Sequence, residues 1–313
     1  MLNFLIRRLA SALVVLFLVS LMSFAIIWLV PGDPTADLLG TSATPEAMAR
    51  MREALGLDKP LLLQMAEWYG RVLSGDLGHS IFLNRGVTGA IIERLPVTLS
   101  LAGVSLAIAM IVGVAAGTIA AMNHNRWPDQ IAMVGALFGL SVPDFWLGLM
   151  LILLFAVKFG AFPTGGYVPF SDDPLGWARS IALPAATLAV IQVGFIARMT
   201  RAALLEVLGQ DYIRTAEAKG LSRTGVVWRH GLPNTFVPVL PVCGIVAGAL
   251  ISGAVVIEQV FSIPGVGRLI IGGVLSRDYP IIQGGLLFLA CVYLLVNLTV
   301  DILYAVLDPR VRL

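Results

Sequence analysis

Charged residues are scarce in this chain. Asp, Glu, Lys and Arg together make up 13% of its 313 residues, whereas hydrophobic residues make up 58%. A soluble domain of this size does not need so much apolar surface. The composition therefore excludes an ordinary water-soluble protein and predicts an all-α polytopic membrane protein. The formal net charge of +2 says little about partners, because the distribution of charge matters more than its sum.

Residues that could bind a metal or a nucleotide are also few. The two cysteines, Cys243 and Cys291, each lie inside an apolar segment, which is typical of packing residues rather than of a disulfide or a metal site. The three histidines, His79, His124 and His230, are split between the two sides of the membrane by the topology below, so no single metal site can use all three. No Gly-rich phosphate loop ending in Lys-Ser or Lys-Thr is present, so we expect no cofactor in this chain.

Long apolar segments dominate what remains. At about 1.5 Å per residue, each can cross a hydrocarbon core of roughly 30 Å. The predicted spans are about 9–30, 98–122, 131–157, 182–200, 236–258 and 282–307. The first follows Arg7 and Arg8 and has neither the short core nor the small-residue site of a cleaved signal peptide, so we expect it to be retained.

The distribution of basic residues predicts the orientation. An even number of spans places both termini on one side, and that side carries more Lys and Arg in its short loops than the opposite side. We therefore expect a multi-pass membrane protein with both termini in the cytoplasm. The loop 201–235 is then cytoplasmic, and the long loop 31–97 is external.

The external loop is long enough to hold structure of its own. Thr44 can cap a helix that begins at Pro45 and stops at Gly56. Asp58 can cap a second helix, from Pro60 to about Ser74, which Gly75 ends. We expect this loop to form a small helical cap on the outer membrane surface.

Small residues recur four positions apart within the spans. Such rows let helices approach closely in lipid, where packing replaces the hydrophobic drive. Tight packing within the bundle explains most of them, and the remainder could pack against a second membrane subunit. The rows are Ala109, Gly113, Gly117 and Ala121; Gly135 and Gly139; and Gly244, Gly248 and Ser252.

Asp144 is the ionisable residue that lies most clearly near the membrane midplane. It follows Pro143, which interrupts the third span. A carboxylate at that depth is costly unless it faces protein or water, so Asp144 either lines a substrate path or satisfies amides freed by the proline kink. Gln192 and Ser252 are further candidates for the path. Asp301 in the last span could pair with Arg198 or Arg201.

A polar, mostly basic island from Asp211 to Asn234 separates two apolar spans. Asp211 can cap a helix that Gly220 ends, and Ser222 can cap a second helix that Gly231 and Pro233 close. On the first helix, Tyr212, Ala216 and Gly220 share one face, whose small residues would let another backbone come close.

Three interpretations compete for this island: an ordinary cytoplasmic loop, a DNA-binding helix-turn-helix, and a coupling element for a soluble motor. The flanking spans leave no room to approach a duplex, so we expect no nucleic acid partner.

The island resembles the cytoplasmic EAA loop of binding-protein-dependent ABC importer permeases. In that motif Glu-Ala-Ala is followed by a Gly and later by Leu-Pro, and Ala216, Gly220, Leu232 and Pro233 fall at the matching positions. Arg214 and Thr215 occupy the Glu and first Ala positions, and His230 stands where an Ile is common. These departures resemble the peptide and nickel branch of the family. The resemblance implies that an ATPase contacts Arg214, Thr215, Ala216, Lys219, Gly220, Leu232 and Pro233.

The resemblance covers nearly the whole chain. The segments that carry it include Pro31-Gly-Asp-Pro, Gly75-Asp-Leu-Gly-His-Ser, Glu93-Arg-Leu-Pro-Val-Thr-Leu, Phe261-Ser-Ile-Pro-Gly-Val-Gly-Arg, Arg277-Asp-Tyr-Pro and Asp308-Pro-Arg-Val-Arg. Each is weak alone, but together and in order they resemble the first permease subunit of dipeptide, oligopeptide, glutathione and nickel importers.

That family implies a single transmembrane permease domain, 1–313, with a type I importer fold of six spans, in the bacterial cytoplasmic (inner) membrane. It implies a heterodimer with a second homologous permease, two ATPase subunits that bind ATP and Mg²⁺, and a periplasmic or lipid-anchored binding protein that selects the substrate. ATP would drive alternating access, with small peptides as the first expectation for the cargo. Glutathione, nickel chelates and other small solutes stay open.

Two other functions compete with this one. An ion-coupled secondary transporter usually shows inverted repeats and several embedded ionisable residues, and neither is evident in this sequence. A membrane-embedded hydrolase needs a nucleophile with a base in reach, and no histidine falls at membrane depth. We therefore expect a transport subunit that is not itself an enzyme.

Overall fold

The computed structural model describes residues 2–29, 35, 44–54 and 56–307. Its helices, in chain order, are α1 (Leu2–Leu29), α3 (Pro45–Ala54), α4 (Leu61–Leu73), α5 (Val87–Met122), α6 (Trp127–Ser141), α7 (Asp144–Leu151), α8 (Pro174–Leu208), α9 (Asp211–Ala218), α10 (Arg223–Val226), α11 (Leu232–Val260), α12 (Val266–Leu275) and α13 (Tyr279–Leu307). Two π-helical stretches, Ile152–Lys158 and Val227–Gly231, follow α7 and α10. The strands β1 (His79–Ser80) and β2 (Arg85–Gly86) form an antiparallel hairpin. The motifs at 31–34 and 308–312 lie outside the described residues.

The chain divides into two compact units. The bundle unit contains residues 97–263 with both chain ends, 1–8 and 293–313. The loop unit contains residues 9–96 and 264–292. The helices α1, α5 and α13 each contribute residues to both units.

The predicted spans are present as helices. Five helices are long and apolar enough to cross a membrane, and the pair α6 and α7 supplies a sixth crossing if the two form one span. That pair is bent by 102°, so the chain breaks at Pro143 rather than kinking gently within one helix. Pro143 cannot donate an amide hydrogen bond, and Val142 and Pro143 are both extended.

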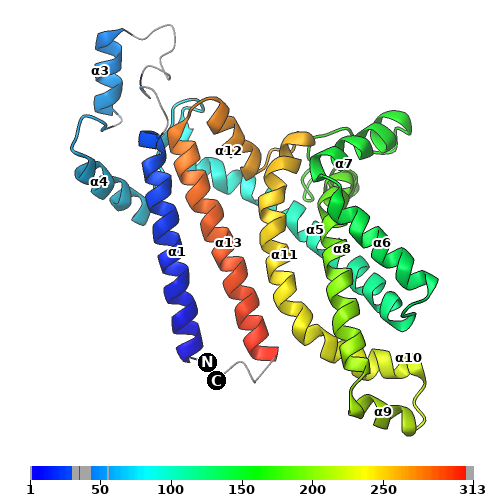
Figure 1. The fold of residues 1–313 in the computed structure, drawn as a ribbon. Helices are drawn as coiled ribbons and strands as arrows, with labels where there is room; N and C mark the ends of the chain where they lie inside the picture. The colour runs from blue at the N-terminus through cyan, green and yellow to red at the C-terminus, as the bar shows by residue number, and fades with distance from the viewer. Residues whose placement is uncertain (1, 30–34, 36–43, 55, 308–313) are drawn as a thin grey trace. The chain divides into compact units, whose positions relative to one another are not determined.

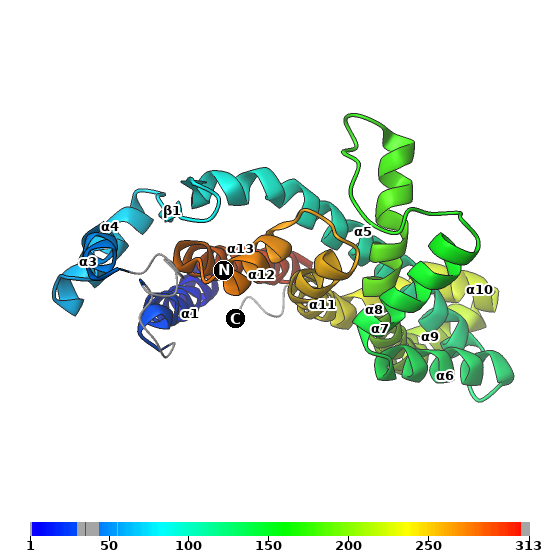
Figure 2. The same cartoon turned by 90° about the horizontal axis from the view of Figure 1, so that it is seen from above.

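Helix α8 forms the centre of the bundle unit. It is the most buried of the long helices and packs against α6, α7 and α11. Figure 2 shows α8 between α11 and α6. The main apolar core joins side chains of α5, α8 and α11, among them Leu101, Ile196 and Leu250.

The predicted glycine rows pack within this unit. A side chain at Gly113 would collide with Ile196, and one at Gly117 would collide with the backbone at Ala197. Gly139 abuts Val190 of α8 in the same way, and Gly244 and Gly248 lie against α13. Gly135 differs, because a Cβ there would meet nothing within 4 Å.

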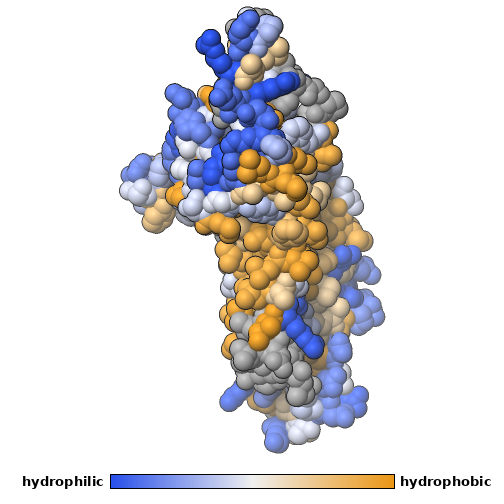
Figure 3. Space-filling view, turned by 90° about the vertical axis from the view of Figure 1, so that its left-hand side faces the viewer, coloured by the Kyte–Doolittle hydropathy of each residue, from blue (hydrophilic) through white to orange (hydrophobic). Residues whose placement is uncertain are grey.

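The loop unit is held by an aromatic cluster and a buried carboxylate. Trp68 of α4 packs against Phe24 of α1 and Leu287 of α13. The buried carboxylate of Asp278 accepts hydrogen bonds from the Ser80 hydroxyl at 2.6 Å and the Phe82 amide at 3.0 Å, which ties the hairpin to the turn before α13. In Figure 3 an apolar surface covers α1, with the polar residues of α3 and α4 above it.

The described residues of the loop 31–97 form helices as predicted, with one correction. The Thr44 hydroxyl caps α3, and Gly56 and Gly75 have positive φ angles of 68° and 82° after the helices they end. Asp58 does not cap α4. That helix begins after Pro60, whose carbonyl accepts the amides of residues 63 and 64, so Asp58 lies too far upstream.

The two glycines Gly117 and Gly135 test the packing of α5 on α8. We expect Gly117→Leu to destabilise the protein by about 1–3 kcal/mol, because the new side chain must displace backbone of α8. Gly135→Leu is the matched control, with the same gain in helix propensity and open space around its Cβ. Thermal unfolding of the detergent-purified chain measures both variants. Equal melting temperatures for the two would contradict the close packing.

Candidate coupling surface

The predicted island begins directly after the central helix. Gly209 ends α8, Gln210 precedes α9, and Asp211 is the first residue of α9 rather than its cap. This corrects the predicted cap by one residue. A carboxylate in the first turn still stabilises the positive end of the helix dipole. The Asp211 side chain is almost fully exposed and lies 3.8 Å from Arg214.

The end of α9 and the start of α10 follow the prediction. Gly220 has a φ of 87°, a conformation that residues with a Cβ rarely adopt, and it turns the chain after α9. The Ser222 hydroxyl accepts the Gly225 amide at 3.2 Å and caps α10. A helix, a tight turn and a second helix result.

The second helix does not close at Gly231 and Pro233, and this part of the prediction is wrong. From α10 the chain continues through the π-helical stretch 227–231 into α11, as one helical segment from Arg223 to Val260. Pro233 therefore lies inside a continuous helical segment, directly after the π-helical stretch, and its missing amide donor leaves one carbonyl of the preceding turn without a backbone partner.

Of the predicted small-residue face of α9, Ala216 points inward, whereas Tyr212 and Gly220 are exposed. Ala216 and Ile213 are buried against Val226 and Leu208 of the same chain. Leu232 is buried with Ala121 and Leu204 in a neighbouring cluster. Ile213 and Ala216 form the apolar side of α9, a short amphipathic helix, and together with Leu232 they anchor the island to the bundle.

The other predicted residues are exposed. Arg214, Thr215, Lys219 and Gly220 lie on the surface of α9 and its turn, which we call the α9 face. Pro233 is also exposed. The aromatic rings of Tyr212 and Trp228 are 44% and 66% exposed nearby, and the same segment carries exposed Arg223 and Arg229. This combination of basic and aromatic side chains is typical of protein interfaces.

The turn between α5 and α6 anchors this region. Arg201 of α8 donates through Nε and Nη2 to both carboxylate oxygens of Asp129, with Nη2–Oδ2 at 2.7 Å. Its Nη2 also lies 3.0 Å from His124 Nδ1. Arg223 Nη2 donates to the carbonyl oxygen of Met122 at 3.2 Å. The turn is therefore bound both to α8 and to α10.

The predicted partner of Asp301 is corrected by these pairs. Asp301 binds Arg8 of α1 at 3.0 Å, whereas Arg201 is occupied by Asp129. The sequence offered no sign of the Asp129 pair, since the two residues are 72 positions apart. Asp129 lies directly before the predicted span 131–157, and an acidic residue at such a position is the signal that could have suggested a partner for it.

The three predicted path residues lie on different helices of the bundle unit. Asp144 is half-buried at the start of α7, and its Oδ1 accepts the Phe145 amide at 2.8 Å. Gln192 is half-buried on α8. Ser252 is exposed on α11, with its hydroxyl donating to the Gly248 carbonyl at 3.3 Å. No hydrogen bond joins any two of these three described residues, and their place on a transport path stays a prediction.

Sequence reasoning missed the most buried carboxylate of the bundle unit. Glu258 of α11 has no solvent exposure, and its Oε1 accepts a hydrogen bond from the Thr98 hydroxyl of α5 at 2.6 Å. Its position near the end of an apolar span concealed it. Among the described residues, no three His, Cys, Asp or Glu side chains gather as metal ligands would.

Comparison with known families decides what this architecture is. Residues 113–313 match the family described as binding-protein-dependent transport system inner membrane component. Residues 1–102 match the family that describes the N-terminal part of such membrane components. The chain belongs to this family. It is therefore a multi-pass inner membrane permease subunit of an ABC importer, and separate ATPase subunits hydrolyse the ATP.

Relatives match this permease along its whole length. A putative peptide transport system permease protein of Brucella abortus (strain 2308) is 47% identical over 307 residues, covering 98% of both chains. The glutathione transport system permease protein GsiC of Escherichia coli (strain K12) is 42% identical over 312 residues, covering 100% of this chain and 99% of that one.

Solved structures show that the fold is that of a type I importer permease. An inward-facing structure of the MetNI methionine ABC transporter aligns with a TM-score of 0.58 at 19% identity, over 70% of this chain and 96% of that one. An amino acid ABC transporter with histidines aligns with a TM-score of 0.51 at 18% identity, over 71% and 94%.

The Asp129–Arg201 pair gives a test of how the candidate surface is anchored. We expect Asp129→Asn to destabilise the permease by about 3 kcal/mol, since it leaves a largely enclosed guanidinium without its anion. Asp211→Asn is the control, because it removes a carboxylate that is almost fully exposed, and it should lower stability much less than Asp129→Asn does. Thermal unfolding in detergent compares them. A stable Asp129→Asn protein would show that the turn is held by other contacts.

Proposed function

We propose that this permease is one of two different channel-forming subunits of an importer that takes up small peptides by alternating access. The observation that carries the proposal is the 47% identity, over nearly the full length of both chains, to a protein named as a peptide transport permease. In this arrangement the second, homologous permease completes the channel. A periplasmic or lipid-anchored binding protein delivers the peptide.

The substrate is proposed at the level of small peptides. The similarity to GsiC favours glutathione as a second candidate, and glutathione is itself a short peptide with a γ-linkage. Both cargoes present carboxylates and amides, so one channel could conduct either when its binding protein selects it. Nickel chelates and other small solutes are less favoured, because the relatives reported above are named for peptide and glutathione transport.

We place the α9 face and both termini in the cytoplasm, on the distribution of basic residues described above. There the α9 face meets an ATPase subunit, while the ATPase pair binds ATP and Mg²⁺. Two features support this docking. The exposed side chains of the α9 face are polar or basic, and its inward side is packed onto the end of the central helix. A push on α9 therefore reaches α8 directly.

Reconstitution of the complete importer tests the function. With the permease pair, the ATPases and the binding protein in proteoliposomes, we expect uptake of a labelled dipeptide that needs ATP and persists when a protonophore collapses the ion gradient. Labelled glutathione measured in the same vesicles ranks the two cargoes. Uptake that stops with the protonophore while ATP is present would instead indicate a secondary transporter.

Two substitutions of Gly220 test docking, because they separate the effect of a bulky side chain from the effect of backbone strain. Gly220→Trp should abolish dipeptide uptake and disconnect ATP hydrolysis from transport, because the indole fills the surface that the ATPase approaches. Gly220→Ala is the matched control. It carries the same backbone strain of about 1–2 kcal/mol at a φ of 87° without the bulk, so it should keep most of the uptake.

Thr215→Trp gives an independent reading, since Thr215 is exposed within α9 and its substitution strains no backbone. It should reproduce the loss seen with Gly220→Trp, measured by uptake and by phosphate release from the same vesicles. Uptake at the wild-type level in both tryptophan variants, with the permease present at normal abundance, would remove the coupling role of the α9 face.

A further inference from the structure

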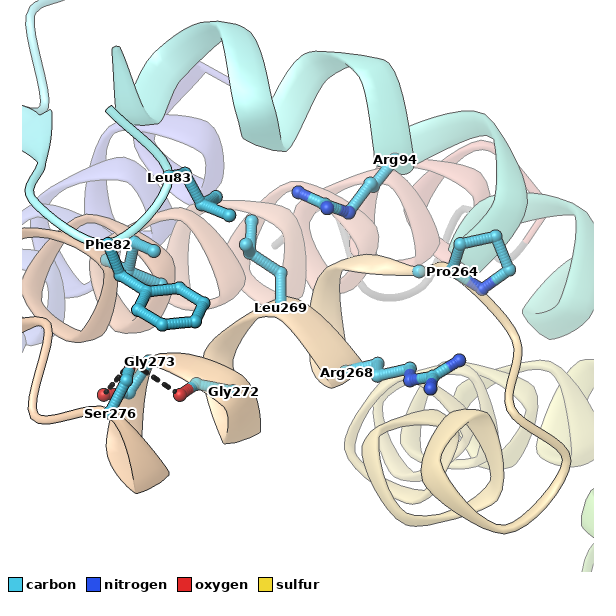
Figure 4. Close-up of a pocket in the computed structure, with 11 residues that line it drawn as sticks. Phe82, Leu83, Arg94, Pro264, Arg268, Leu269, Gly272, Gly273 and Ser276 are labelled. Carbon is cyan, nitrogen blue, oxygen red and sulfur yellow. Dashed lines mark hydrogen bonds between the residues drawn. The ribbon is translucent and has the colours of Figure 1, made fainter. Parts of the chain in front are cut away.

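Two cavities of the loop unit differ in the charges that line them. The larger, of about 300 Å³, is drawn in Figure 4. Its lining is almost wholly apolar, and the side chains of Arg94 and Arg268 point in opposite directions, so no charged groups converge there. The smaller cavity, of about 150 Å³, is lined by Arg71, Asp76 and His79 together with apolar and aromatic residues. The smaller cavity therefore combines charges of both signs.

The end of α4 brings the two opposite charges together. Arg71 lies in the last turn of α4, and Gly75 turns the chain with a φ of 82°. The Asp76 amide then donates to the Arg71 carbonyl at 2.9 Å, and Asp76 Oδ1 accepts the Gly78 amide at 2.9 Å. Both charged residues are thus held by one short turn, directly before the strand that carries His79.

The rest of the lining is fixed by contacts between α1, the hairpin and α13. Gln283 Nε2 donates to the Phe24 carbonyl at 3.2 Å, and the Ser23 hydroxyl donates to the Gln283 carbonyl at 2.7 Å. A Cβ at Gly78 would lie 3.4 Å from Pro280 Cβ, so the turn after α4 packs on the start of α13. The smaller cavity is therefore preformed, as small-molecule sites usually are.

The charged groups of the smaller cavity keep their binding capacity. Among the described residues, the Arg71 guanidinium has neither an ion-pair partner nor a hydrogen-bond partner, and Asp76 uses only Oδ1. Arg71 and Asp76 are exposed, whereas Trp68 and Tyr279 of the same lining are buried, so the charges lie where the cavity opens. A guanidinium matches the two oxygens of a carboxylate, and a carboxylate oxygen accepts from an ammonium group.

We propose that the smaller cavity binds a small zwitterion, an α-amino acid or a dipeptide, with the ligand carboxylate at Arg71 and the ligand ammonium at Asp76. Its volume equals the share of about five water molecules in the liquid, which is room for a ligand of that size. A simple anion would be repelled by Asp76, and a simple cation by Arg71. The site is distinct from the α9 face, and its existence does not depend on which solute the importer carries.

Equilibrium binding to the detergent-solubilised importer, with the binding protein and ATP left out, tests the proposal. Labelled alanine and labelled dialanine are the probes, and the tighter of the two identifies the source of the zwitterion. We expect Arg71→Gln and Asp76→Asn each to weaken binding by about tenfold, the effect of losing one charged hydrogen-bonding partner. The side-chain oxygen that Asp76→Asn retains still accepts the Gly78 amide, so the turn persists.

Blocked dipeptides show which ligand group each residue binds. N-acetyl-dialanine lacks the ammonium and dialanine amide lacks the carboxylate, so the wild type should bind each about tenfold more weakly than dialanine. Arg71→Gln should abolish the difference between dialanine and its amide. Asp76→Asn should abolish the difference between dialanine and its N-acetyl form. A merely structural role for either residue would weaken all three ligands equally and would contradict the assignment.

Arg50→Gln and Asp58→Asn are the matched controls. Both residues are exposed in the loop unit and lie outside the lining of the smaller cavity, so both variants should bind dialanine as the wild type does. The proposal is overturned if neither probe binds, or if binding persists unchanged in Arg71→Gln and Asp76→Asn. The second result would place the zwitterion elsewhere in the importer and would leave peptide uptake as its function.

Discussion

Close approach of helices around α8 is the constraint on which the rest of this permease depends. In hydrocarbon, helix association gains little from the hydrophobic effect and relies on packing at short range. Gly113 and Gly117 of α5 and Gly139 of α6 bring those helices against the backbone or side chains of α8. Gly194 of α8 in turn abuts the backbone at Ala136. Glycine is needed at these contacts because a Cβ would occupy the space of the neighbouring helix.

As a consequence of this packing, the central helix α8 is connected rigidly to the surface segment α9. Helix α9 follows α8 after only two residues, and its apolar side is buried against Leu208 and Val226. The α5–α6 turn adds two polar ties, through Arg201 and Arg223. The α9–α10 segment is thus held by its apolar packing and by Arg223, and the turn that Arg223 contacts is itself held to α8 by Arg201, so the segment moves together with the bundle. This is what an element that transmits work from a separate ATPase must do.

Local features of this surface could be predicted from the sequence, and tertiary ones could not. The turn at Gly220 and the cap at Ser222 depend on a few adjacent residues, so their sequence pattern was sufficient. The burial of Ala216 depends on Val226 across the turn, and the i, i+4 spacing alone did not show which side faced inward. The Asp129–Arg201 pair and the buried Glu258 arise from helices far apart in the chain, where no local pattern reports proximity.

The π-helical stretch 227–231 sets the direction in which the α9 face is presented. A π-helical stretch holds one residue more than the α-helix it interrupts, and one residue corresponds to about 100° of rotation about the helix axis. This surplus lets Val226 face α9 while Val227 and Leu232 face α5 and α8. The direction in which the α9 face points around the axis of α11 is thus set by a single additional residue, rather than by the contacts of the face itself.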